Sequence, residues 1–431
     1  MQQVLVVELN EVNFEFLDAY IKLGKLPNFR TLIEEHGVTE TTSEAQYEDI
    51  EPWIQWVTAH TGKSLEEHRV FRLGDIETKD LEQIWERLES RFGLRVGAIS
   101  PMNAKNQSDR PAFFVPDPWT NTPVTAGSVV TNLFQAVRQV VNDNASAQIK
   151  LSSLFWLAIG AASVSGPADY LQYGRWMAGV RRRKWIKALV LDKLLSNLFI
   201  QQVKRHQPDF ATLFLNGAAH IQHHYMFNSA VYRGRPSNPD WYVDSGEDPV
   251  LEVYELYDTV IGRMLAAFPE ARLMIATGLH QDPHANLTYY WRLREHDAYL
   301  KKIGVPFEAV EPRMSRDFLI RCESEDQATR AEAVLRSATA ADGDELFSVD
   351  NRGTDLFVML EYAKDIDRGF SYTVDGNRHE GLANDVAFVA LKNGQHNGIG
   401  YLMDTGIPRR DAPPTMPLAG LFNYIQEVYS V

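Results

Sequence analysis

This sequence has very little cysteine, and it has fewer basic than acidic residues. Only one of the 431 residues is a cysteine, Cys322, so an internal disulfide and a zinc site built from cysteines are excluded. A reducing compartment is the simplest environment for such a chain. Acidic residues number 57 against 43 basic residues, which gives a formal charge of −14. Because contacts to a phosphate backbone need a basic surface, we expect no nucleic-acid partner.

Long apolar runs and targeting signals are also missing. The most apolar window, residues 151–166, falls short of the roughly 20 residues that a membrane span requires, so we expect a core helix there and no membrane span. The first residues, MQQVLVVELNE, lack the charged region, apolar core and cleavage site of a signal peptide. A cytoplasmic location is therefore expected. The one basic cluster, RRRK at 181–184, is interpreted as a solvated helix face, with a contact to an anionic head group or carbohydrate phosphate as the alternative.

Several familiar catalytic motifs do not occur. No Gly-x-Ser-x-Gly elbow is present, which disfavours a serine hydrolase, and no Gly-x-Gly-x-x-Gly follows the first strand, which argues against a dinucleotide enzyme. The stretch HTGKS at 60–64 resembles the end of a phosphate-binding loop. Position 57, where that loop needs a glycine, is Val57, so this interpretation is rejected.

What the sequence does contain is an alternation of buried strands and helices. Continuous apolar runs at 3–9, 94–100, 208–216 and 272–278 are separated by helical patterns. This predicts an α/β fold with a doubly wound, mostly parallel sheet flanked by helices, whose ligands bind at the carboxyl ends of the strands. The expected domains are a core at 1–307 with a helical insertion at 126–205, a small α+β cap at 308–375, and a return to the core at 376–431. We expect the cap to cover the pocket and set specificity.

Polar side chains gather where the predicted strands end. Glu8 and Asn10 close the first strand, and Asn216 follows the run LFLN. His220 and His224 then share a helix face, a familiar metal-ligand spacing, although structural histidines would give the same pattern. His396 is expected in a glycine-rich loop after a buried strand.

These segments, in this order, resemble the alkaline phosphatase superfamily, specifically its type I phosphodiesterase, nucleotide pyrophosphatase and sulfatase branch. The resemblance covers 3–100, 205–280 and 385–410, and its motif residues include Trp56, Thr61, Gly62 and His68 in the stretch EDIEPWIQWVTAHTGKSLEEH. It implies an alkaline-phosphatase-like core and one surviving metal site. The ligands that it implies are Asn216, His220 and His396, for a single divalent ion of zinc, manganese, calcium or magnesium.

The second metal site of the family is replaced in this sequence. Asn10 stands where the family has a metal-binding Asp, and Gly278 and Leu279 stand where it has an Asp-His pair. The position of the family's nucleophile falls near Glu51 or Pro52. Two metal ions about 4 Å apart, which clamp the attacking and leaving oxygens in the usual mechanism, are therefore not expected.

The resemblance leaves two functions open. The first is a divergent hydrolase or transferase acting on a phosphate or sulfate ester of a small molecule or glycan. The residues expected to carry its chemistry are Glu8, Asn10, Glu51 and His60, with Glu8, Glu11 or Glu51 as general base and His60, His220 or His396 stabilising charge or donating a proton. The alternative is an inactive ligand-binding or assembly module. His223 and His224 are expected to support the site from outside or to be structural.

Overall fold

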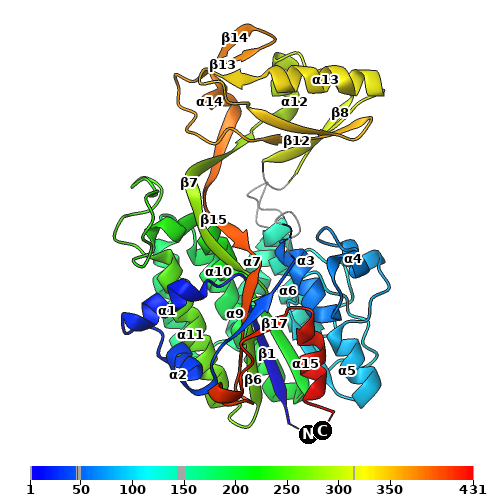
Figure 1. Cartoon of the computed structure of the whole chain (residues 1–431), viewed down its shortest axis with the longest axis vertical. Helices are drawn as coiled ribbons and strands as arrows, with labels where there is room; N and C mark the ends of the chain where they lie inside the picture. Colours follow the sequence, from blue (N-terminus) through cyan, green and yellow to red (C-terminus); the bar gives the residue numbers. More distant parts are fainter. Residues whose placement is uncertain (1, 45, 47–49, 143–150, 314–315, 431) are drawn as a thin grey trace. The chain divides into compact units, whose positions relative to one another are not determined.

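Two compact units make up the chain in a computed structural model that describes residues 2–44, 46, 50–142, 151–313 and 316–430. The first unit comprises Met1–Arg235, Pro239–Pro283 and Gly394–Val431, and the second comprises Pro236–Asn238 and His284–Asn393. Figure 1 labels many of their elements. Within the described residues, no helix is both long enough and apolar enough to cross a membrane.

The first unit is built on one large sheet. Its strands, in spatial order, are β17 (Thr415–Pro417), β2 (Thr39–Thr42), β16 (Ile399–Asp404), β6 (Arg272–Ala276), β1 (Val4–Leu9), β5 (Phe210–Leu215), β3 (Val96–Ile99) and β4 (Phe113–Val115). The pairings of β1 with β5 and β6, of β3 with β4 and β5, and of β17 with β2 are parallel, and β16 is antiparallel to both neighbours. The predicted fold class is confirmed.

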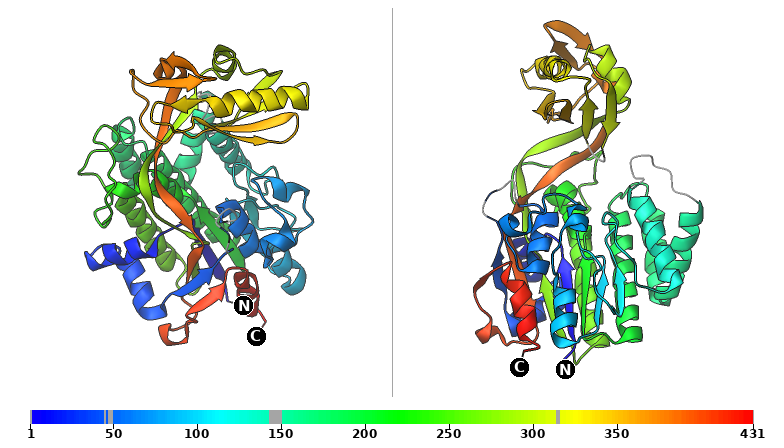
Figure 2. Two further views of the ribbon diagram at one scale, coloured as in Figure 1. Left: turned by 45° about the horizontal axis from the view of Figure 1, so that its top comes forward. Right: turned by 90° about the vertical axis from the view of Figure 1, so that its right-hand side faces the viewer.

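Helices cover both faces of this sheet (Figure 2). Leu5, Val7 and Leu9 of β1 belong to one core, and Val4 and Val6 belong to the other, as the alternation of side chains along a strand requires. The first core includes residues of α1 (Phe14–Lys22), α2 (Pro27–His36), α9 (Ile186–His206), α10 (Gly217–Tyr225) and α11 (Pro249–Ala267). The second includes residues of α3 (Pro52–Thr61), α5 (Ile84–Phe92) and α15 (Gly420–Glu427).

Shorter elements and a helical insertion complete the first unit. The short elements are α4 (Leu65–His68) and the 3₁₀ helices Asp75–Thr78, Met226–Asn228 and Arg409–Asp411. The insertion contains α6 (Ser128–Asn142), α7 (Leu151–Val164) and α8 (Pro167–Gly179), which lead into α9. Residues 143–150 of the predicted helical insertion lie outside the described residues. In the right-hand view of Figure 2 these teal helices form the outermost layer on one side of the unit.

The second unit has its own core and small sheets. Its elements are β7 (His280–Leu293), α12 (His296–Lys302), β8 (Ala309–Pro312), β9 (Asp317–Arg321), α13 (Glu325–Ser337), β10 (Thr339–Ala340), β11 (Phe347–Asn351), β12 (Asp355–Leu360), β13 (Ser371–Val374), β14 (Asn377–Glu380), α14 (Leu382–Asp385) and β15 (Val386–Asn397). The sequence placed this unit at 308–375. It spans 284–393 because β7 and β15, which pair with each other, belong mostly to it.

The topology brings several chain segments to one edge of the large sheet. Because β1, β5, β6 and β2 all run in the same direction, they end at the same edge, and the antiparallel β16 begins there. His396 is the second-to-last residue of β15 and lies three residues before the start of β16. It was expected in a loop, but it belongs to a strand. Glu11, Asn216 and Glu51 follow the ends of β1, β5 and β2, so this edge is the place to look for a site.

Candidate metal centre

Glu11 lies in a turn that the surrounding chain holds firmly. Its backbone is left-handed, with φ of 62°, a conformation that non-glycine residues adopt infrequently and that clusters at functional sites. Its N–H donates to the carbonyl of Thr277 at 3.2 Å, and its own carbonyl accepts from Nε2 of Gln222 at 2.6 Å. The side chain is buried, so its carboxylate has a fixed position beyond the end of β1.

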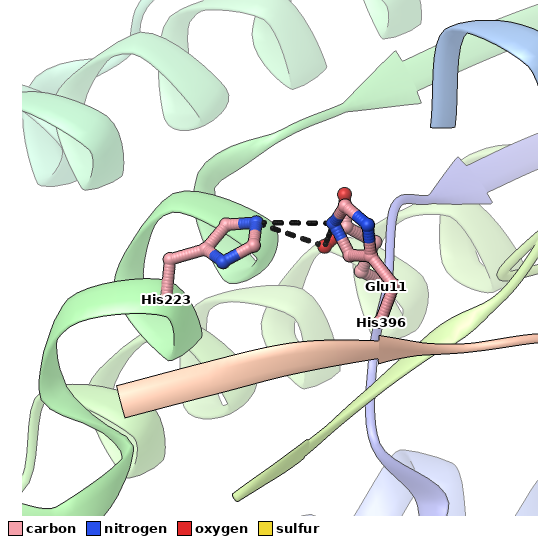
Figure 3. Close-up of side chains that lie close together, drawn as sticks. All are labelled: Glu11, His223 and His396. Carbon is pink, nitrogen blue, oxygen red and sulfur yellow. Dashed lines mark hydrogen bonds and ion pairs between the residues drawn. The ribbon is translucent and has the colours of Figure 1, made fainter. Parts of the chain in front are cut away.

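The carboxylate of Glu11 meets two imidazoles from distant parts of the sequence (Figure 3). Its Oε2 lies 3.3 Å from Nε2 of His223, on α10, and 3.3 Å from Nε2 of His396, on β15. The two Nε2 atoms are themselves 3.3 Å apart. Among the described residues, this is the group of carboxylate and imidazole side chains that could hold a metal ion.

The triangle of equal sides fits a tetrahedral divalent ion. Ligand atoms at bond lengths of about 2.0 to 2.1 Å around a tetrahedral zinc ion lie about 3.3 to 3.4 Å apart. A network of hydrogen bonds alone would have shorter distances, of about 2.7 to 2.9 Å for a charged N–H and a carboxylate. Two histidines and one glutamate are also the ligand set of catalytic zinc sites that keep a fourth position for water. The residues present therefore fit one zinc-like ion.

Neighbouring side chains hold the ligands from outside the triangle. Nδ2 of Asn10 donates to the other carboxylate oxygen of Glu11 at 3.0 Å, and Nε2 of Gln281 donates to Oε2. On the far side of His396, its Nδ1 lies 3.5 Å from a carboxylate oxygen of Glu51. A carboxylate near the second ring nitrogen of a ligand histidine favours the tautomer that leaves Nε2 for the metal.

The carboxyl group of Glu11 and the imidazole of His396 shift each other's pKa. Burial alone would raise the pKa of the Glu11 carboxyl, but His396 and His223 outweigh it and hold the pKa below its usual range. Burial alone would lower the pKa of His396, but the carboxylates of Glu11 and Glu51 outweigh it and raise the pKa. The site thus favours a positive charge at this point, carried by a proton or by a metal ion.

Glu8 and His60, two of the residues expected to be catalytic, form a buried pair that is separate from the triangle of Glu11, His223 and His396. Nε2 of His60 lies 3.0 Å from Oε1 of Glu8, and the hydroxyl of Thr212 donates to the same oxygen at 2.7 Å. Both side chains of the pair are buried, with 5% and 4% of their surface exposed. Oε2 of Glu8 and Nδ1 of His60 have no hydrogen-bond partner among the described residues. A substrate cannot reach either group in this conformation.

Trp56 packs beside Asn10 at the end of β1. Its indole N–H donates to Oδ1 of Asn10 at 2.7 Å, and the Asn10 amide donates to Oδ1 of Asn216 at 2.8 Å. Because an indole only donates, the amide oxygen of Asn10 must face Trp56. The Trp56 ring also lies against Gly278, where an added Cβ would meet it at 2.9 Å. Asn10 therefore supports Glu11 and packs with Trp56, whose ring occupies the space between Asn10 and Gly278.

Of the three residues expected as metal ligands, the triangle contains His396 alone. Asn216 accepts the hydrogen bond from Asn10, and His220 is an exposed side chain of α10 whose ring packs against His224 with centroids 5.2 Å apart. His223, expected outside the site, supplies the helix ligand, and Glu11, expected as a possible base, supplies the carboxylate. The clustering of polar residues at the strand ends was the signal for Glu11. The helix alone gave no reason to prefer His223 to His220.

Comparisons with known proteins give similarity in structure only. No protein-family model and no curated protein matches the chain. Among solved structures, the chain is similar to phosphonoacetate hydrolase from Sinorhizobium meliloti 1021, with 11% identity and a TM-score of 0.47 over 100% of this chain and 96% of that one. Murine ectonucleotide pyrophosphatase/phosphodiesterase 5 gives 11% identity and a TM-score of 0.44 over 100% and 95%.

A TAB5 alkaline phosphatase gives 10% identity and a TM-score of 0.41 over 99% of this chain and 97% of that one. All three proteins are members of the alkaline phosphatase superfamily, the family that the sequence resembles. The fold class rests on the order and direction of its own strands.

Proposed function

We propose that the chain is a hydrolase or transferase that uses one divalent metal ion, held by Glu11, His223 and His396, to act on a phosphoric or sulfuric ester. The observation that carries the proposal is the triangle of three ligand atoms, each 3.3 Å from the other two. The ester class of substrate is supported by the resemblance of the sequence, and it includes small-molecule and glycan-linked esters. When bound, such an ion would act as a Lewis acid on an ester oxygen or on water.

A side chain of the protein must also act as the general base. Glu51 is the candidate general base, because 34% of its side chain is exposed, whereas Glu8 and Glu11 are sealed at 4% and 2%. A base must come within hydrogen-bond reach of the proton that it removes, and among these three carboxylates only that of Glu51 can do so without a conformational change. Pro52 begins α3 directly after it, so this position offers a carboxylate and no hydroxyl nucleophile. Direct attack by water therefore suits the site better than a covalent intermediate.

Metal binding is the first test of the proposal. Zinc should bind chelator-treated protein with a stoichiometry of one by isothermal titration calorimetry, and Glu11→Gln or His223→Ala should abolish binding. His220→Ala is the matched control, since it removes an imidazole three residues away that lies outside the triangle. Absence of binding in the unmodified protein, or equal loss in His223→Ala and His220→Ala, would contradict the assigned site.

Turnover is the second test, and chromogenic esters separate the substrate classes. We expect metal-dependent release of nitrophenol from a nitrophenyl phosphodiester, phosphomonoester or sulfate ester, and loss of that release in His223→Ala. Glu51→Gln should lower the rate while a full equivalent of metal stays bound at saturation.

A binding module is the second candidate function, and the chemistry of position 51 favours it. The position of the Thr, Ser or Cys nucleophile of the resembled family falls near Glu51 or Pro52, neither of which has a hydroxyl or thiol group, so metal and ligand could be held without hydrolysis. Stoichiometric metal with no turnover of any of the three ester classes, together with tight binding of inorganic phosphate or sulfate, would favour this function over the hydrolase.

A further inference from the structure

Helix α7 exposes several large apolar side chains to solvent. Leu154 and Phe155 are 48% and 58% exposed, and Leu151, Ala158 and Ala162 on the same helix face are exposed as well. The fully buried positions are Ser153 and Gly160, and Leu157, Ala161 and Val164 pack, partly buried, against the cluster of Leu133, Val137 and Leu194. The helix is therefore apolar on its outer side as well as on its inner side, whereas an ordinary surface helix presents a polar outer face.

Gly160 shows how closely α7 approaches its neighbour. A Cβ added at this position would lie 2.5 Å from the side chain of Leu133 on α6, so the small residue permits tight packing there. The glycine side of α7 is therefore its inner side, and the outward direction of Leu154 and Phe155 follows from this packing.

The next helix, α8, also exposes large apolar side chains. Its buried residue is Asp169, whose carboxylate lies 2.8 Å from Nζ of the buried Lys193 and 3.4 Å from Nη1 of Arg263. Its outward residues include Leu171 at 60% and Met177 at 56% exposure. Two consecutive helices thus expose large apolar residues in addition to the apolar residues, such as Leu157 and Trp176, that pack inward, and exposed apolar residues of this kind indicate a contact surface.

Positive charge is concentrated on α8 and in the residues that follow it in the chain. From Asp169 to Asp192 the sequence has no other acidic residue, and it has six basic ones in a chain whose formal charge is −14. Arg182 pairs with Asp244, and Arg183 pairs with Glu247 and Glu252. The other four are Arg175, Arg181, Lys184 and Lys187, which are exposed and form no ion pair among the described residues. Exposed cations near a membrane surface that contains anionic lipid are attracted to that surface.

From these observations we propose that the outer face of α7 and α8 docks onto a membrane surface that contains anionic lipid. Leu154, Phe155, Leu171 and Met177 would enter the boundary between head groups and acyl chains, and the basic residues would contact phosphate head groups. Neither helix crosses the bilayer, because α7 has 14 residues and α8 has 13. The charge complementarity selects an anionic surface over an apolar protein groove. The proposal does not depend on the proposed function, because it uses none of the metal-site residues.

Vesicle flotation of the full-length protein tests the proposal. The probes are vesicles of phosphatidylcholine alone and vesicles with one third phosphatidylglycerol, each at low and high salt. We expect flotation with the anionic vesicles and much less with the neutral ones, and we expect added salt to weaken it. The variant Leu154→Glu/Phe155→Glu should reduce the bound fraction about tenfold, because it places charge where the surface inserts. Arg181→Glu/Lys184→Glu should reduce flotation on anionic vesicles only.

The matched control is Leu23→Glu/Phe71→Glu, which adds the same charge at apolar residues that are 59% and 55% exposed elsewhere on the first unit. It should float like the unmodified protein. Circular dichroism and thermal melting establish that each variant is folded. No flotation with either vesicle would overturn the proposal, and so would equal loss in the control. Self-association that Leu154→Glu/Phe155→Glu abolishes, without vesicle binding, would assign the face to a second copy of the chain and overturn it as well.

Discussion

Two acid–imidazole groups lie beyond or near the end of β1, and they differ in what surrounds them. The pair of Glu8 and His60 is one carboxylate and one ring in a sealed core. The triangle of Glu11, His223 and His396 has three convergent atoms, and 32% of the His223 side chain is exposed. Proximity of a carboxylate to an imidazole therefore does not define a site. The number of converging ligand atoms and the access of solvent separate a metal centre from a buried polar pair.

The largest expected effect comes from breaking the sealed pair. Glu8→Ala leaves the buried His60 without its carboxylate, and loss of one partner of a buried pair costs about 3 to 5 kcal/mol of unfolding free energy. Chemical denaturation measures this cost, and zinc titration of the folded variant should still give one bound ion. Glu8→Gln, which can keep an oxygen for Thr212, should cost less. Loss of metal binding in folded Glu8→Gln would contradict the separation of the two groups.

His68 extends the comparison to a buried imidazole that no carboxylate contacts closely. Its Nδ1 accepts from the N–H of Val70 at 3.0 Å, and its Nε2 lies 3.1 Å from the hydroxyl of Thr58, as a neutral ring requires. Burial lowers the pKa of His68 to about 4. In the unfolded chain His68 has a pKa near 6.5, so below that pH the unfolded chain binds a proton that the folded chain does not bind. The free energy of unfolding therefore declines as the pH falls from about 6.5 to 4.

The expected loss is about 2 to 3 kcal/mol over that interval, since one pKa unit corresponds to about 1.4 kcal/mol. Denaturation at a series of pH values measures the slope. His68→Asn, which retains an acceptor for the Val70 N–H, should be less stable at pH 7 and should have a smaller slope between pH 6.5 and 4. An unchanged slope would show that His68 takes up its proton in the folded protein.

Much of the fold could be predicted because its signals are local. Strand β1 is a continuous apolar run, and α3 begins with Pro52 and ends before Gly62, whose φ of 67° suits the end of a helix. The long strand β15 could not be predicted as easily, because its polar end, with His396, reads as a loop. Its pairing with β7 is a tertiary contact that the local pattern does not contain.

The site could be predicted only as far as the edge of the sheet on which it lies. His220 and His223 are three residues apart on α10, so their directions differ by about 60° around the helix axis. Which of them meets His396 depends on how α10 rotates against β1, and buried contacts fix that rotation: Gln222 holds the Glu11 carbonyl at 2.6 Å. Such long-range contacts are invisible in a single sequence.

The smallest expected effect concerns Glu51, the carboxylate that joins the triangle from outside. Its Oε2 lies 3.5 Å from Nδ1 of His396, so Glu51→Gln removes a charge that favours the ligand tautomer while it retains shape. Loss of such a supporting group weakens metal binding about 10- to 100-fold. Competition with a chromogenic chelator measures the affinity, and Glu66→Gln, a neutralisation on an exposed part of α4, serves as the control. Unchanged affinity in Glu51→Gln would restrict Glu51 to the role of a base, and the metal centre would then consist of the triangle and its contacts with Asn10 and Gln281.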